Sequence, residues 1–181
     1  MAAADAPHAA LDGNRTVEVK RRMFTRRELE KAGFEGWLPF GAIAASTCPE
    51  SGGVYVVTYP DSGAIDFNQR SCGGWFKGKD PTVSLEALAA NWVDRAEVVY
   101  IGKADQLRRR LRQYADFGAG KPVGHWGGRL IWQLPAIDLL HVGWKETPGR
   151  RPVDVEAELI DQFRQANGKP PFANDPHRLG R

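Results

Sequence analysis

One stretch of the chain, EVVYIGKADQLRRRLRQY at residues 97–114, concentrates side chains that can bind phosphate. A tyrosine and a lysine come first, and four arginines interrupted by one leucine follow. At about 100° per residue, Leu107, Leu111 and Tyr114 share a helical stripe that should face the core. Arg110 borders that stripe, so its guanidinium can reach across the domain and bind phosphate oxygens in a bidentate manner. An arginine that forms a structural ion pair at the edge of the core is the alternative.

The other three arginines of this stretch take different directions on the predicted helix. Arg109 points away from the apolar stripe, and Arg108 and Arg112 lean outward. Side chains placed in this way contact the backbone of a nucleic acid through their charge, independently of its sequence, or they are simply solvated. A solvated basic helix is therefore the alternative to a phosphate site.

A second predicted helix carries a carboxylate on its apolar side. The apolar face of residues 153–167 is made by Val155, Leu159, Ile160 and Phe163. Glu156 falls near the middle of that face, whereas Glu158 projects into water. A carboxylate in an apolar stripe is costly unless something pairs with it. The pattern leaves two interpretations open: an ion pair with Arg110, or a ligand for a hard cation such as Mg²⁺.

Five sequence elements occur in an order that is typical of one nuclease superfamily. They are Gly53-Val54-Tyr55, Tyr100-Ile101-Gly102, Arg110, Glu156 in the run EAELI, and Asn174 in the run PFAN. On these residues the chain resembles the GIY-YIG nucleases over roughly residues 52–174. The run 100–114 is similar to the corresponding segment of the bacterial excision-repair incision subunit. Each tripeptide alone is a weak signal, but all five elements in order make a strong one.

The chain departs from this family pattern between the two tripeptides. Family members usually join them by a short hairpin, but here 44 residues separate Tyr55 from Tyr100. An insertion at about residues 60–97 would allow the two tyrosines to lie on adjacent strands. It would either enlarge a substrate-binding surface or cover the sheet. Tyr114 occupies a position that is histidine in some members and tyrosine in the repair-type branch.

The resemblance implies a divalent-metal-dependent endonuclease that hydrolyses phosphodiester bonds in double-stranded or branched DNA. It implies a one-metal mechanism in which Glu156 binds Mg²⁺ or Mn²⁺, which polarises the scissile phosphate. Arg110 is then expected to stabilise the charge that develops on the phosphate oxygens. Tyr55 or Tyr100 is expected to help to remove a proton from the attacking water. An ordinary tyrosine titrates near ~10, so it needs assistance from the cation, from Lys103 or from the arginine.

Supporting roles follow from the same resemblance. Tyr114 is expected to position the substrate or the attacking water, and Asn174 to orient the site through hydrogen bonds. The expected contacts with the nucleic acid are Arg108, Arg109, Arg112, Lys121, His125 and Arg129. His125 and Arg129 belong to the loop GHWGGR, which matches no core family motif, and an incidental histidine is the alternative there.

Two other functional classes compete with the nuclease interpretation. One is a catalytically inactive nucleic-acid-binding module with the same fold. The other is a basic structural or partner-binding domain in which Arg110 and Glu156 merely pair. Restriction, phage-defence, repair and mobile-element enzymes all use this type of domain. The pathway, the DNA preference and the oligomeric state are left open.

The elements that must position these residues follow from local patterns. Strands are expected at residues 53–59, 98–102, 129–134 and 139–144, and helices at 25–34, 84–96, 105–114 and 153–167. Thr25 and Glu28 fit a capping box, and Asp105 is the expected N-cap of its helix. Strands and helices without βαβ regularity indicate an α+β domain around a small sheet. The resemblance adds that this sheet is mostly antiparallel and flanked by helices.

The domain organisation is expected to be simple. Residues 1–50 are predicted to be a flexible tail and an N-terminal helical extension, whose apolar segment 33–43 folds back onto the main body. Residues 51–176 are expected to form the nuclease-like domain, and residues 177–181 a short tail.

Composition limits the function less than the motifs do. A formal net charge of +3 and a pI near 9.0 permit an anionic partner without requiring one. Cys48 and Cys72 have no metal-ligand spacing; they would pair in a disulfide or stay reduced in a cytosol. We find no secretory signal and no apolar run near the ~18 residues of a membrane span, so we expect a cytoplasmic protein without a membrane partner.

Overall fold

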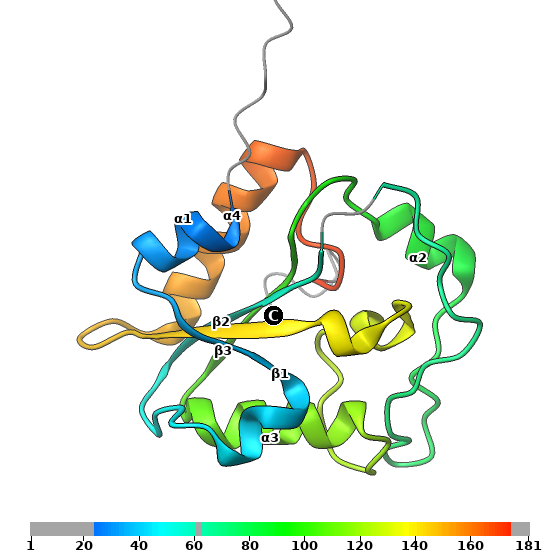
Figure 1. Cartoon of the computed structure of the whole chain (residues 1–181), viewed down its shortest axis with the longest axis horizontal. Coiled ribbons are helices and arrows are strands. Elements are labelled where there is room, and N and C mark those ends of the chain that lie inside the picture. Colours follow the sequence, from blue (N-terminus) through cyan, green and yellow to red (C-terminus); the bar gives the residue numbers. More distant parts are fainter. Residues whose placement is uncertain (1–23, 61–62, 175–181) are drawn as a thin grey trace, which may run out of the picture.

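The computed structural model describes residues 24–60 and 63–174, and the expected terminal tails lie outside them. Four strands form one antiparallel sheet in the order β1-β4-β2-β3 (Figure 1). Their bounds are Glu35–Pro39 for β1, Gly53–Thr58 for β2, Val98–Ala104 for β3 and His141–Glu146 for β4. The prediction of an α+β fold around a small antiparallel sheet is confirmed.

Helices cover both faces of the sheet (Figure 1). One face packs against α1, Arg26–Lys31, and α4, Pro152–Asn167; the other packs against α3, Leu107–Gly118, and the 3-10 helix η1, Phe40–Ala45. The central strand β2 is buried along its whole length, which suits its β-branched and aromatic residues. Val54 and Val56 belong to the core on the α4 side, and Tyr55 and Val57 to the core on the α3 side.

The helix predictions are largely confirmed. The capping box of Thr25 and Glu28 forms as expected at the start of α1. Helix α3 buries the predicted stripe and continues to Gly118. The prediction that Asp105 caps α3 is wrong, because Gln106 is the N-cap and its side chain makes no capping bond. The first free amides of α3 instead donate to the carbonyls of Ser51 and Pro49, at 3.0 and 2.9 Å.

One predicted strand is wrong, and one strand was not predicted. Residues 129–134, expected to be a strand, form the 3-10 helix η2, Arg129–Gln133. The buried Gln133 explains this, because its amide bonds to the backbone of the insertion and holds the segment in place. In contrast, β1 was not predicted as a strand. It lies in the apolar segment that was expected to fold back, and it becomes an outer strand paired with β4.

The described part of the insertion, residue 60 and residues 63–97, is mostly irregular and carries α2, Leu85–Asn91, which is shorter than the predicted helix. It packs on the domain through aromatic side chains. Phe67 stacks on Phe172 with ring centroids 5.5 Å apart, and Trp92 contacts both rings edge-on. The insertion therefore covers the part of the hydrophobic core that contains Phe172.

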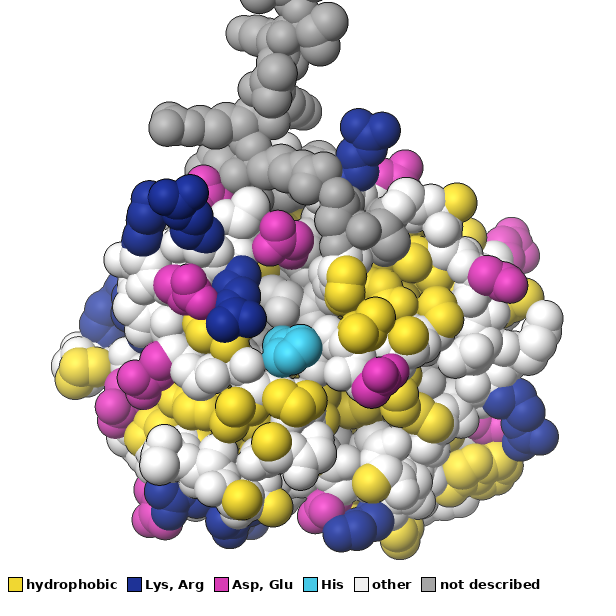
Figure 2. All heavy atoms as spheres, in the orientation of Figure 1, with side chains coloured by type: hydrophobic (Ala, Val, Ile, Leu, Met, Phe, Trp, Pro, Cys, Tyr) yellow, Lys and Arg dark blue, Asp and Glu magenta, His cyan; other side chains and the backbone are white. Residues whose placement is uncertain are grey.

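The surface shows no concentration of charge on the face drawn in Figure 2. Among the described residues there, basic and acidic side chains are interspersed, and hydrophobic side chains gather in a band (Figure 2). Cys48 and Cys72 are both free thiols. No helix in the described part of the chain is long and apolar enough to cross a membrane.

Candidate active site

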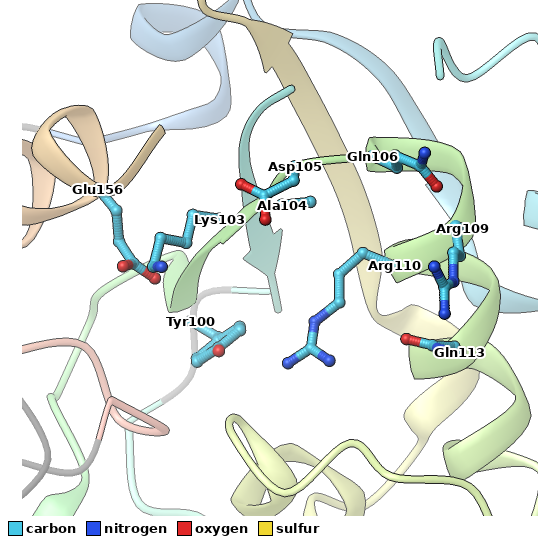
Figure 3. Close-up of a pocket in the computed structure, with 9 residues that line it drawn as sticks. All are labelled: Tyr100, Lys103, Ala104, Asp105, Gln106, Arg109, Arg110, Gln113 and Glu156. Carbon is cyan, nitrogen blue, oxygen red and sulfur yellow. The ribbon is translucent and has the colours of Figure 1, made fainter. Parts of the chain in front are cut away.

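Four of the residues predicted to be catalytic line a single cleft of about 590 Å³. Tyr100 and Lys103 come from β3, Arg110 from α3 and Glu156 from α4, so the cleft lies where the end of β3 passes between the two helices (Figure 3). The remaining lining residues are Ala104, Asp105, Gln106, Arg109 and Gln113. None of the nine lining residues belongs to the insertion.

Helix packing explains why Arg110 and Glu156 meet. Ile160 and Phe163 anchor α4 in the core beside β2 and β3, and Glu156 lies one turn before Ile160 on the same side of the helix. Leu107 and Leu111 anchor α3 on the opposite face of the sheet. The two side chains therefore approach the end of β3 from opposite faces and enter the same cleft (Figure 3).

Behind the cleft, three tyrosines form one cluster. The ring centroids of Tyr55, Tyr100 and Tyr114 are 5.7 to 6.3 Å apart. Tyr55 lies opposite Gly102 across the β2–β3 pair, and a Cβ atom at Gly102 would come within 2.5 Å of the Tyr55 ring. The glycine of the second tripeptide thus makes room for the tyrosine of the first.

The surroundings distinguish Tyr55 from the other two tyrosines. Burial raises the pKa of all three, and that of Tyr100 and Tyr114 is raised well above the ordinary value. The charge of Arg110 opposes the shift of the pKa in each case, but only for Tyr55 do the nearby polar groups of Arg110 and Tyr100 lower the pKa further. Tyr55 is therefore the tyrosine whose phenolate is best stabilised.

Glu156 is half-buried in the cleft wall. Burial raises the pKa of its carboxyl, while the charges of Lys103 and Arg110 and the backbone amide of Lys103 act in the opposite direction. Within the described residues no ion pair joins Glu156 to Arg110, so the structural pairing considered above is not formed. Its carboxylate is left facing the cleft.

The donor set fits one hard cation. No group of three or more His, Cys, Asp or Glu side chains that could enclose a metal occurs in the described part of the chain. Mg²⁺, however, is commonly held by one or two carboxylates together with waters and substrate phosphate. Glu156, facing an open and polar cleft, suits that mode of binding and not a closed all-protein site.

The loop at residues 124–129 closes over the tyrosine cluster. The hydroxyl of Tyr114 donates to the carbonyl of Gly128 at 2.7 Å, and the His125 ring stacks on Tyr114 with centroids 3.7 Å apart. His125 is only 1% exposed, and neither ring nitrogen has a partner in the described structure. The expected contact of His125 with nucleic acid at the surface is therefore wrong for this conformation, because the glycine-rich loop places the ring inside the core.

Asn174 acts on the site from outside the cleft. Its Oδ1 accepts from the amide of Ile101 at 2.9 Å, and its Nδ2 donates to the carbonyl of Ile101 at 2.8 Å. Ile101 lies between Tyr100 and Gly102, so Asn174 holds the strand that carries the second tripeptide. It contacts backbone and does not line the cleft.

Of the predicted nucleic-acid contacts, only Arg109 lines the cleft. Arg108 donates to the carbonyl of Cys48 and pairs with a glutamate, and Arg112 donates to the carbonyl of Ala44. Lys121 pairs with an aspartate 2.6 Å away. Arg129 lies over the Trp126 ring at 4.8 Å.

Three polar lining residues were not predicted. Asp105, Gln106 and Gln113 border the cleft beside Arg109 and Arg110. The spacing that selected Arg110 also places Gln106 and Gln113 one turn before and one turn after it, so the signal was present in the sequence.

Comparison with protein-family models, with curated proteins and with solved structures finds no match to this chain. The arguments for a function are therefore the motif residues and the cleft that three of them, Tyr100, Arg110 and Glu156, line. The tyrosine cluster behind that cleft is the third argument for a function.

Proposed function

We propose that this chain is a GIY-YIG-type endonuclease that hydrolyses phosphodiester bonds in DNA with the help of Mg²⁺ or Mn²⁺. One observation carries the proposal. Arg110 and Glu156 come from helices on opposite faces of the sheet and face one cleft without pairing to each other. Two opposite charges kept apart around a polar cleft suit a substrate that is itself anionic and binds a cation.

The residues of the cleft divide the chemistry among them. Arg110 binds the scissile phosphate and stabilises the negative charge that develops on its oxygens. Glu156 holds the divalent ion, which when bound polarises the phosphate and makes a bound water more acidic. Lys103, on the same strand as Tyr100, adds positive charge beside Glu156.

We assign Tyr55 as the general base that accepts a proton from the attacking water. The side chains of Arg110 and Tyr100 both act to lower its pKa, and both of these residues line the cleft. The water oxygen forms a bond to phosphorus and one ester P–O bond breaks. One DNA fragment keeps the phosphate, and the leaving oxygen of the other takes a proton from solvent water and becomes a hydroxyl. The proton of the attacking water passes to the phenolate form of Tyr55.

Other residues keep this arrangement in place. Tyr114 closes the back of the cluster and Asn174 fixes the backbone of β3. Two free thiols are compatible with the cytoplasmic location that we also propose.

Incubation with plasmid and branched DNA tests the proposal, with Mg²⁺ in one arm and a chelator in the other. Glu156→Ala is the test variant and Glu158→Ala the matched control, because Glu158 lies on the same helix but pairs with Arg150 at the surface. We expect metal-dependent cutting that is lost in Glu156→Ala and kept in Glu158→Ala.

Other outcomes reject the proposal in distinct ways. Binding of DNA by both proteins without cutting would indicate the inactive nucleic-acid-binding module. Neither binding nor cutting would favour a structural or partner-binding domain. Cutting that survives Glu156→Ala would exclude the assigned metal ligand.

A further inference from the structure

A row of three polar side chains follows α3 along the wall of the cleft. Gln106, Arg109 and Gln113 are spaced by three and then four residues, so they lie one above the other at successive turns of the helix. At 1.5 Å per residue the row spans about 10 Å. Figure 3 shows the three on the same side of α3, with Arg109 and Gln113 next to each other beside Arg110.

This row is available for a ligand, whereas Arg108 and Arg112 of the same helix are not. Gln106 and Arg109 are exposed and Gln113 is half-buried. In the described structure none of the three side chains makes a hydrogen bond or an ion pair. Arg108 and Arg112, on another side of the helix, are both bonded to the segment that precedes β2. The helix therefore has a structural side, with Arg108 and Arg112, and a free side, with Gln106, Arg109 and Gln113.

The chemistry of the free side differs from that of a simple phosphate contact. A phosphate only accepts hydrogen bonds, so the carbonyl oxygens of two glutamines would find no donor on it. Base edges offer both donors and acceptors. In the major groove, glutamine forms a two-bond pair with adenine and arginine with guanine.

We propose that Gln106, Arg109 and Gln113 form a specificity-determining subsite that contacts DNA bases on one side of the scissile phosphate. The inference rests on the proposed function, because it takes the DNA strand at Arg110 as its starting point. At about 3.4 Å of helix rise per base pair, a 10 Å row corresponds to about three base pairs. Each side chain then contacts a different base pair, and the preference extends from the cut in one direction.

The sequences of cut ends test this subsite. Wild-type protein and the variants Gln106→Ala, Arg109→Ala and Gln113→Ala would digest a pool of DNA with a randomised segment in Mg²⁺. We expect the wild-type protein to prefer particular bases at positions close to the cut. Each variant should lose the preference at one position by about 5-fold to 150-fold, the effect of one two-bond pair with a base.

Arg112→Ala is the matched control for the loss of an arginine from the same helix. Arg112 is bonded to Ala44 and does not line the cleft, so its removal should leave the base preference unchanged. Equal preferences in all variants would overturn the inference. A uniform loss of cutting across every sequence would also overturn it, because that result indicates contacts with the backbone alone.

A second measurement separates this inference from the proposed function. Sequences bound from the same pool in Ca²⁺, with no cutting required, would be compared between wild type and variants. A base preference that the variants lose supports the subsite even in a protein that does not cut. Binding without any base preference overturns it, whether or not the protein cuts.

Discussion

Replacing His125 with phenylalanine should remove the contribution of this residue to acid destabilisation of the fold, while keeping the packing of the loop. The ring is 1% exposed, stacks on Tyr114 and has two nitrogens without partners in the described structure. Burial, together with the positive charge of Arg110, holds the pKa of His125 well below its ordinary value. The native protein therefore keeps this ring neutral, and phenylalanine matches its planar shape without titrating.

The direction of the effect follows from proton binding. In the unfolded chain a histidine takes up a proton near pH ~6.5, whereas native His125 does so only at lower pH. Below about pH 6.5 the unfolded state thus binds more protons, and the free energy of unfolding decreases as the pH falls. The limiting slope is about 1.4 kcal/mol per pH unit. Between pH 6.5 and 5 this amounts to at most about 2 kcal/mol.

Urea unfolding of both proteins between pH 5 and 8, followed by tryptophan fluorescence, measures this contribution. The free energy of unfolding of His125→Phe minus that of wild type should be constant above pH 7 and should increase toward pH 5. Glu156 has a raised pKa but is present in both proteins, so its titration cancels in the difference. At pH 7 the variant should be at least as stable as wild type, because a buried polar group without partners costs about 1–3 kcal/mol.

Two results would refute the reasoning. A difference that stays constant from pH 5 to 8 would mean that native His125 takes up its proton as readily as the unfolded chain. A variant that is strongly less stable at pH 7 would mean that the imidazole makes hydrogen bonds in solution that are absent from the described structure.

The remaining predictions concern the backbone around the tyrosines. Gly128→Ala should be less stable than Gly149→Ala by roughly 1–3 kcal/mol in thermal unfolding. Both glycines have positive φ, but only at Gly128 would a Cβ atom clash, 2.3 Å from the buried hydroxyl of Tyr114; equal losses would contradict the close contact. Asn174→Leu should lower the free energy of unfolding by at least about 2 kcal/mol, because it leaves two backbone groups of Ile101 unpaired. Faster hydrogen exchange at the Ile101 amide checks this, and unchanged exchange would argue against the contact.

The parts of the site that the sequence predicts are those set by helical periodicity. Leu107 and Leu111 fix which side of α3 faces the core, and Ile160 and Phe163 do the same for α4. The positions of Arg110 and Glu156 follow from these anchors. Spacing alone places each charge beside the core, and the packing of helices on both faces of the sheet brings the charges together.

The errors arise where tertiary contacts override local pattern. The amides of Leu107 and Arg108 find carbonyl partners in a distant segment, so Asp105 is not needed as a cap. The sequence of β1 does not alternate between apolar and polar residues, because the pairing of this strand shifts between Gly36 and Leu38. The strand was therefore not predicted. The sequence around Arg108 does not reveal that its side chain donates to the carbonyl of Cys48, sixty positions away. This bond keeps Arg108 out of the cleft.

The two hydrogen bonds between Asn174 and Ile101 also affect whether molecules of this protein can associate through their sheets. β3 is an outer strand, and an outer strand with free amides and carbonyls is a template for pairing with another chain. Here Ala173 donates to Val99 and Asn174 occupies both groups of Ile101, so the last described residues take the place of a fifth strand. At the opposite edge, β1 is interrupted by its shifted register and ends in Pro39. Both borders of the sheet are thus protected from intermolecular strand pairing, and the protein is expected to resist aggregation by that route even at high concentration.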